Sequence, residues 1–124
     1  MTEIDKPSDK LQSVLEYIED VKERYEAASE AMKLEDKRLQ DLLHELEFAE
    51  DKAERNKVAT KFQRSRRERR KQKDIMQELE LLVEFFGSAN HKNTISKIRP
   101  LIEKQKKREE YLDGERYYNK RVDE

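Results

Sequence analysis

The chain has 124 residues, of which 46% are charged and only 34% belong to the hydrophobic class, and its formal net charge is −1. This composition excludes a large compact core, but a coiled coil needs only a narrow apolar seam. The sequence contains no cysteine, which excludes disulfides and thiolate chemistry.

A first helix is expected over residues 8–50. Asp9 should cap its start, with Gln12 three residues later as the reciprocal partner. Apolar residues then recur every seven positions, and this heptad pattern predicts a long helix packed against another one. One companion position, Glu35, interrupts the pattern. The seam residues are Leu11, Ile18, Tyr25, Met32, Leu39 and Leu46, and their companions are Val14, Val21, Ala28 and Leu42.

A second helix is expected over residues 51–87, with a seam in a new register. Neither Gly nor Pro lies between residues 48 and 56, so one continuous helix of about 115 Å, at 1.5 Å per residue, is the alternative. We predict a turn near residues 50–53 instead, because Asp51 and Glu54 form a capping-box pattern and a turn explains the change of register. The seam residues of this helix are Val58, Phe62, Met76, Leu79, Val83 and Phe86.

The remaining chain predicts a loop over residues 88–93, a third helix over 94–112 and a tail over 113–124. Pro100 should either kink the third helix or restart it with the proline in its first turn. The tail follows an Asp-Gly turn signal and could form a short strand. The expected fold is therefore mainly α, a single domain of residues 1–124 with a long antiparallel, coiled-coil-like helical hairpin, a shorter third helix and a C-terminal strand.

A basic run over residues 63–74 separates the two halves of the second seam. It contains seven Lys or Arg and two acids, whereas residues 16–50 contain twelve acids and five bases. In a hairpin the run faces Glu35, so we expect Glu35 to pair with Arg66 or Arg69 and to fix the register. At 100° per residue the seven cations cover all sides of a helix, so some must point outward. Phosphate contacts are expected among Arg66, Arg67 and Arg70.

Further candidate ligand-binding residues lie late in the chain. Aromatic rings can stack on a base, amides can bind a base or ribose, and arginines can bind phosphate. The bland alternatives are loop packing for the rings, turn formation for the amides and an unstructured tail. The two histidines form no metal-ligand pattern, and we expect no metal, no cofactor, no catalytic residue and no enzyme activity. The candidates are Phe85, Phe86, Asn90, Asn93, Arg116, Tyr117, Tyr118 and Arg121.

Three short motifs carry a resemblance to a known family: "DLLHELEF" at residues 41–48, "RRERRKQKD" at 66–74 and "RYYNKRV" at 116–122. In this order they resemble small helical phage proteins, the Thoeris anti-defence sponges. The resemblance implies sequestration, without cleavage, of a cyclic ADP-ribose isomer made in bacterial immunity, in some members also cyclic oligonucleotides, and it implies oligomers. It also implies a ligand site with an aromatic ring, an asparagine and late arginines, which corresponds to the candidates above.

Two other functions remain open from the sequence: a coiled-coil interaction or scaffold protein, and a phage accessory protein that binds nucleic acid. A net charge near zero argues against the last. The apolar seam is longer than one partner helix covers, so we expect a homo-oligomer. The first ten residues lack the apolar core of a signal peptide, and no stretch reaches the roughly 18 apolar residues of a membrane span. We therefore expect a cytoplasmic protein, acting in an infected bacterial host.

Overall fold

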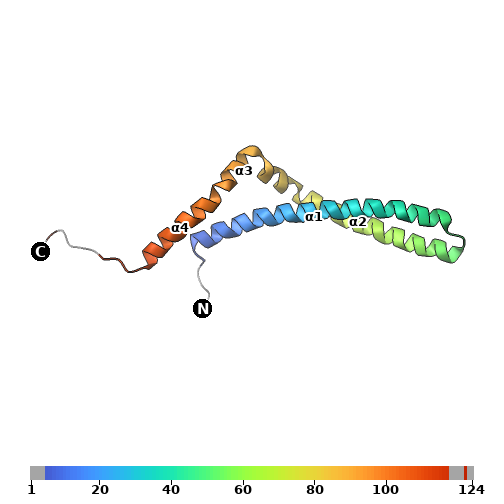
Figure 1. Cartoon of the computed structure of the whole chain (residues 1–124), viewed down its shortest axis with the longest axis horizontal. Helices are drawn as coiled ribbons and strands as arrows, with labels where there is room; N and C mark the ends of the chain where they lie inside the picture. The colour runs from blue at the N-terminus through green and yellow to red at the C-terminus, as the bar shows by residue number, and fades with distance from the viewer. Residues whose placement is uncertain (1–4, 118–121, 123–124) are drawn as a thin grey trace. The chain divides into compact units, whose positions relative to one another are not determined.

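The computed structural model describes residues 5–117 and residue 122. This part of the chain is almost entirely helical, with four helices: α1 (Pro7–Phe48), α2 (Lys52–Gly87), α3 (Ala89–Ser96) and α4 (Ile98–Asp113). The expected mainly α fold with a long helical hairpin is confirmed, and Figure 1 shows the helices in chain order. None of these helices is both long and apolar enough to cross a membrane.

The described chain divides into two compact units. Unit 1 comprises the described residues of 1–18 and 88–124, and unit 2 comprises Glu19–Gly87. Unit 1 is therefore built from two segments that are far apart in the sequence. Unit 2 is the uninterrupted segment between them.

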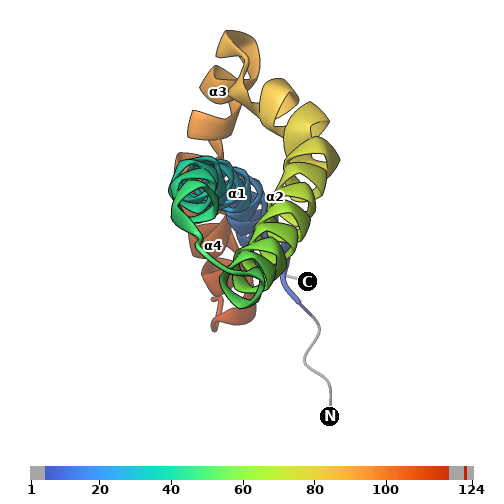
Figure 2. The ribbon, with the colours of Figure 1, turned by 90° about the vertical axis from the view of Figure 1, so that its right-hand side faces the viewer.

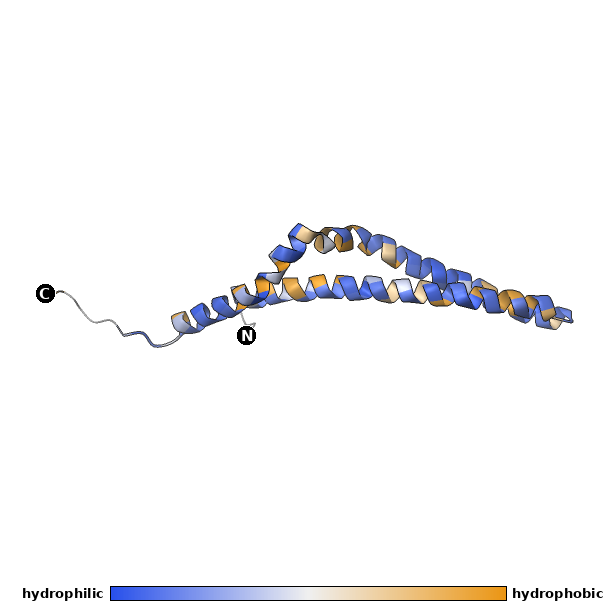
Figure 3. Cartoon of the chain, turned by 45° about the horizontal axis from the view of Figure 1, so that its top comes forward, coloured by the Kyte–Doolittle hydropathy of each residue, from blue (hydrophilic) through white to orange (hydrophobic). Residues whose placement is uncertain are grey.

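Unit 2 is a hairpin in which α1 and α2 lie side by side and run antiparallel (Figures 1 and 2). The companion row of the α1 heptads is the buried face, because Val21, Ala28, Glu35 and Leu42, spaced by seven, are each at most 3% exposed. The predicted seam row is half-buried at Ile18, Tyr25, Met32 and Leu39. Val14 and Leu46 are exposed, at 49% and 44%, so the prediction is wrong for these two. In α2 the buried residues are Val58, Ser65 and Leu79, which follow the same spacing. Hydrophobic positions accordingly appear as short patches along otherwise hydrophilic helices (Figure 3). The narrow seam explains how so charged a chain forms stable helices.

The turn between α1 and α2 lies at residues 49–51, which overlaps the predicted range of 50–53. The backbone N–H of Glu54 donates to Asp51 Oδ1 at 2.8 Å, and the N–H of Glu50 donates to Glu54 Oε2 at 2.9 Å. Two backbone donors that the helix start would leave unpaired are thus satisfied by side chains. The capping-box prediction is confirmed for Asp51, while Glu54 reaches Glu50 and not Asp51.

The basic run does not interrupt the seam of α2, contrary to the expectation from its charge. Ser65 is buried, and Arg69 and Gln72 are half-buried, so the positions between Phe62 and Met76 keep the heptad spacing. Two of these polar seam residues have partners on α1, since Ser65 donates to Glu35 and Arg69 to Asp36. Gln72 instead donates to Glu68 on α2 itself. The helix remains regular through the run, and no change of register occurs within it.

Unit 1 joins the first turns of α1 to the end of α4. Glu109 accepts hydrogen bonds from both the backbone N–H, at 3.1 Å, and the hydroxyl of Ser8, and the Lys6 ammonium forms an ion pair with Asp113. Asp9 lies in the first turn, and its carboxylate accepts from the Lys6 N–H. The expected Asp9–Gln12 cap is therefore wrong: Pro7 starts the helix, and a carboxylate from α4 satisfies its N-terminus.

The segment after α2 differs from the predicted loop and third helix. Residues 89–96 form α3, and a second helix, α4, begins at Ile98, so the loop predicted over 88–93 is wrong. Pro100 lies in the first turn of α4, which is the restart alternative. It has no N–H to donate to residue 96, and its ring would clash with that carbonyl in a continuous helix. The tail shows no strand at residues 114–117 or at 122, and the rest of that prediction lies outside the described residues.

Candidate functional site

A cluster of polar side chains, here called the polar layer, crosses the middle of the hairpin seam. Glu35 is its centre, with 3% of its surface exposed. The Ser65 hydroxyl donates to Glu35 Oε2 at 2.6 Å, and Arg38 Nη1 donates to Glu35 Oε1 at 2.6 Å. Both oxygens of a buried carboxylate are therefore satisfied, which offsets the cost of removing its charge from water.

A second acidic side chain links the polar layer to the basic run. Arg69 Nε donates to Asp36 Oδ1 at 2.8 Å, and Arg66 Nη2 lies 4.0 Å from the same oxygen. The predicted pairing of Glu35 with Arg66 or Arg69 is therefore wrong by one residue, because the neighbouring Asp36 takes the arginines. A polar register contact does exist at this level of the hairpin, but Ser65 and not an arginine contacts Glu35 across the seam.

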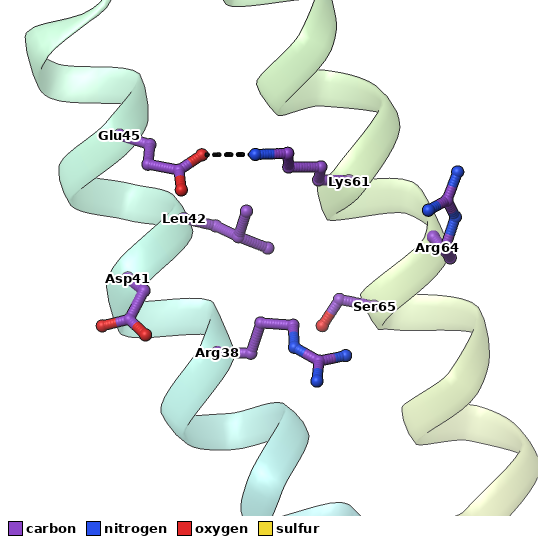
Figure 4. Close-up of a pocket in the computed structure, with 7 residues that line it drawn as sticks. All are labelled: Arg38, Asp41, Leu42, Glu45, Lys61, Arg64 and Ser65. Atoms are coloured by element: carbon purple, nitrogen blue, oxygen red, sulfur yellow. Dashed lines mark hydrogen bonds and ion pairs between the residues drawn. The ribbon is translucent and has the colours of Figure 1, made fainter.

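A shallow groove lies beside the polar layer, on the side nearer the turn (Figure 4). Leu42 and Ser65 form its floor, and the ion pair between Lys61 and Glu45, at 3.3 Å, closes one end. Its cations and acids are close to balanced in number, so the groove offers no strong preference for an anion. The lining residues are Arg38, Asp41, Leu42, Glu45, Lys61, Arg64 and Ser65.

The outward part of the basic run is a separate surface, here called the α2 basic face. It consists of the exposed cations Arg64, Arg67, Arg70, Lys71 and Lys73. Of the three phosphate candidates, Arg67 and Arg70 belong to this face, whereas Arg66 is half-buried beside Asp36. The prediction that part of the run points away from α1 is confirmed by these exposures.

The two phenylalanines at the end of α2 contact each other. Their ring centroids are 5.5 Å apart at an interplanar angle of 78°, an edge-to-face arrangement. Phe86 is half-buried, whereas Phe85 is 55% exposed. Adjacent residues point about 100° apart on a helix, which explains why the two rings do not share the seam. Both belong to unit 2.

Asn90 and Asn93 lie on α3, one turn apart, and both are exposed. Their backbone carbonyls accept hydrogen bonds from the hydroxyls of Thr94 and Ser96. They belong to unit 1. The structure therefore brings the two asparagines together, as it does the two phenylalanines.

Arg116 and Tyr117 follow the end of α4, also in unit 1. The Arg116 guanidinium carbon lies 5.9 Å from the centre of the Tyr111 ring, within cation–π range. Tyr117 is 89% exposed, and its hydroxyl donates to Glu115. Tyr118 and Arg121 lie outside the described residues.

Four contributors were missed by sequence reasoning: Tyr111, Asp36, Ser65 and Arg38, the last of which donates to Glu35. Tyr111 lies five residues before Arg116, a spacing that indicates no contact until the helix is known to end at Asp113. Asp36 adjoins Glu35, and Ser65 adjoins Arg66, two residues that the sequence analysis had selected as candidates. Extending the heptad spacing of Val58 through the run would have placed Ser65 on the seam.

No group of three or more His, Cys, Asp or Glu that could hold a metal ion occurs within residues 5–117 or at 122. The arrangement can bind anions, hydrogen-bonding groups and aromatic rings. Comparison of the chain with protein-family models, curated proteins and solved structures gives no match.

Proposed function

We propose that this protein binds a cyclic nucleotide signal, in the first place a cyclic ADP-ribose isomer, and sequesters it without cleaving it. Such a ligand presents two phosphates, two riboses and an adenine. It requires cations, hydrogen-bonding amides and a ring for stacking. The resemblance to the Thoeris anti-defence sponges motivates this proposal, and it implies a cytoplasmic location in an infected bacterium.

The observation that carries the proposal is the Arg116–Tyr111 contact in unit 1. A guanidinium stacked on a ring keeps its edge available to a phosphate, while the ring limits its motion. Asn90 and Asn93 present exposed amides in the same unit.

Calorimetric titration of the purified protein with a panel of cyclic ADP-ribose isomers tests the proposal. The bound ligand is then released by heating and identified. Intact ligand is expected, since sequestration leaves it unchanged. A cleaved product would show an enzyme, and failure of every isomer to bind would remove the sponge function.

Arg116→Ala tests the site. Loss of a charge-assisted hydrogen-bond pair should weaken binding by about 1.5–3 kcal/mol, or about ten- to a hundredfold. Arg116→Lys should restore little, because lysine cannot bind phosphate in a bidentate way. Arg108→Ala, an exposed arginine on α4, is the matched control and should bind normally. Equal binding by the Arg116 and Arg108 variants would show that the ligand binds elsewhere.

A second function, a coiled-coil interaction protein that also self-associates, is supported by a different observation. Large apolar side chains are exposed on both helices of the hairpin, with Leu34 at 54% and Leu81 at 77%. Exposed apolar surface of this kind marks interfaces. If this function is correct, substitutions of the seam and surface leucines should reduce association with the partner chain, and Arg116→Ala should have no effect on it.

A further inference from the structure

The charge on the surface of α2 is segregated along the helix. Between residues 57 and 73 every exposed charged side chain is a cation, and Glu68, the acid in this stretch, is half-buried. Lys61 is paired with Glu45. The other six form no ion pair within the described part of the chain, which leaves their charges available. They are Lys57, Arg64, Arg67, Arg70, Lys71 and Lys73.

Three of these cations form a straight row. Arg64, Arg67 and Lys71 are spaced three and four residues apart, so they share one face of α2 over a rise of about 10.5 Å. They line a shallow groove with Thr60, Gln63 and Glu68. The opposite face of this stretch is held to α1 by Ser65 and Arg69. The row is thus carried on a rigid support.

The composition of this surface argues against a protein partner. No large hydrophobic residue is exposed on the described chain between Phe48 and Leu81. Protein interfaces depend on a buried core with aromatic or apolar anchors, and rim charges add little affinity. A surface of cations without an anchor recognises its partner by charge alone.

The same composition distinguishes between nucleic acids. Proteins that bind single strands combine a cationic groove with aromatic rings on which the bases stack, and this stretch of α2 exposes no ring. A duplex needs no stacking, because its backbone presents a regular row of phosphates. Arginine matches phosphate geometry in a bidentate way. We propose that the α2 basic face binds the phosphate backbone of duplex nucleic acid, independently of sequence.

In the sequence analysis, the net charge of −1 argued against binding to nucleic acid. That whole-chain value does not describe the charge around the α2 basic face. Residues 19–30 carry five acids and two bases. Their middle lies about 17 Å along α1 from Asp36, the residue that faces the basic run. Charges are screened over about 8 Å at physiological ionic strength. An approaching phosphate backbone therefore meets the local excess of cations.

Fluorescence anisotropy with a labelled 20-base-pair duplex, at 50–200 mM salt, tests this proposal. With about four phosphate contacts, the logarithm of the binding constant should fall with the logarithm of salt with a slope of about −3 to −4. The triple variant Arg64→Gln, Arg67→Gln, Lys71→Gln should bind about ten- to a hundredfold more weakly, with the slope reduced by about 3.

The control variant removes the same charges from exposed positions elsewhere: Lys22→Gln, Arg24→Gln, Arg108→Gln. It should bind the duplex as the unaltered protein does, and circular dichroism should show equal helicity for all three proteins. Equal weakening by both triple variants would overturn the proposal, because it would reflect net charge alone.

Other outcomes also overturn it. Failure to bind duplex at 50 mM salt and micromolar protein would remove the function. Tighter binding of a single strand would require stacking rings that this face lacks. Binding of inorganic pyrophosphate but not of duplex would assign the face to a small anion. Binding of a polyglutamate peptide as tightly as duplex would assign it to acidic protein segments.

Discussion

Glu35 and Ser65 show how a single polar contact can occupy a coiled-coil seam. Leucine at both positions would bury more apolar surface and need no partner. The carboxylate instead requires a donor at one position on α2, and a shift of α2 along α1 would leave it buried without that donor. Buried polar groups in coiled coils specify register in this way, at a cost in stability.

Ser65→Ala should therefore destabilise the hairpin. The substitution leaves Glu35 Oε2 buried without its donor, which costs about 1–3 kcal/mol in the free energy of unfolding. Urea unfolding followed by circular dichroism measures this change. Thr60→Ala is the matched control on the same helix, since its exposed hydroxyl bonds only to the Asn56 carbonyl.

The double variant Glu35→Leu, Ser65→Ala separates the polar contact from packing. With no carboxylate to satisfy, its stability should return to at least that of the unaltered protein. If Ser65→Ala proved as harmless as Thr60→Ala, the polar layer would have no role in stability.

At the scale of elements, α1 and α4 are joined in unit 1 through ionisable groups. The side-chain hydrogen bond from Ser8 holds the pKa of Glu109 below its ordinary value of 4.5, against the opposing effect of burial, and the Ser8 backbone N–H adds to the lowering. The hydrogen bond and charge of Asp113 raise the pKa of Lys6 above 10.5. The N-terminus of α1 also favours the negative charge of Glu109.

This contact should open at both extremes of pH. A lowered folded pKa means that the stabilisation from Glu109 is complete above pH 4.5 and is lost as pH falls below it. A raised folded pKa means that Lys6 contributes fully below pH 10.5 and loses its contribution above it. In a carboxyl NMR titration Ser8→Ala should return the Glu109 pKa toward 4.5, whereas Ser13→Ala should leave it unchanged. An unaltered Glu109 titration in Ser8→Ala would contradict the contact.

How far the sequence predicts such elements depends on how local their causes are. The heptads and the Asp51 cap depend on neighbours within seven residues and were predicted. The restart at Pro100 is equally local, and it was one of two predicted alternatives. The partner of Ser8 lies 101 residues away, and nothing near either residue indicates it. Glu35 shows the intermediate case. The position of the turn predicted which part of α2 lies opposite Glu35, but the heptad position decides which α2 side chain in that part points toward it.

For the whole molecule, the exposed apolar surface predicts association. Leu34 and Leu81 lie on the surface of unit 2, where leucine makes no contribution to its own seam. Burying them against another copy would remove this surface from water. Helices that associate through such faces commonly form closed, symmetric oligomers.

Sedimentation equilibrium at micromolar concentrations should give a mass that is a multiple of 15.0 kDa. Leu34→Glu or Leu81→Glu should lower that mass while helicity is retained, since both side chains are exposed. Glu78→Gln, an exposed change on α2, should have no effect. A single-chain mass for the unaltered protein at every concentration would exclude self-association.

The division of unit 1 into two distant segments has a kinetic consequence. The hydrogen bonds across the hairpin near its turn join residues only 16 to 33 positions apart, whereas the Ser8–Glu109 contact closes a loop of 101. Loop closure costs more entropy as the loop lengthens, and a folded hairpin shortens the chain that must be closed. The hairpin should therefore form first, starting from residues 49–51. In pulsed hydrogen exchange during refolding, the backbone amides in the first turns of α1 should be the last to gain protection.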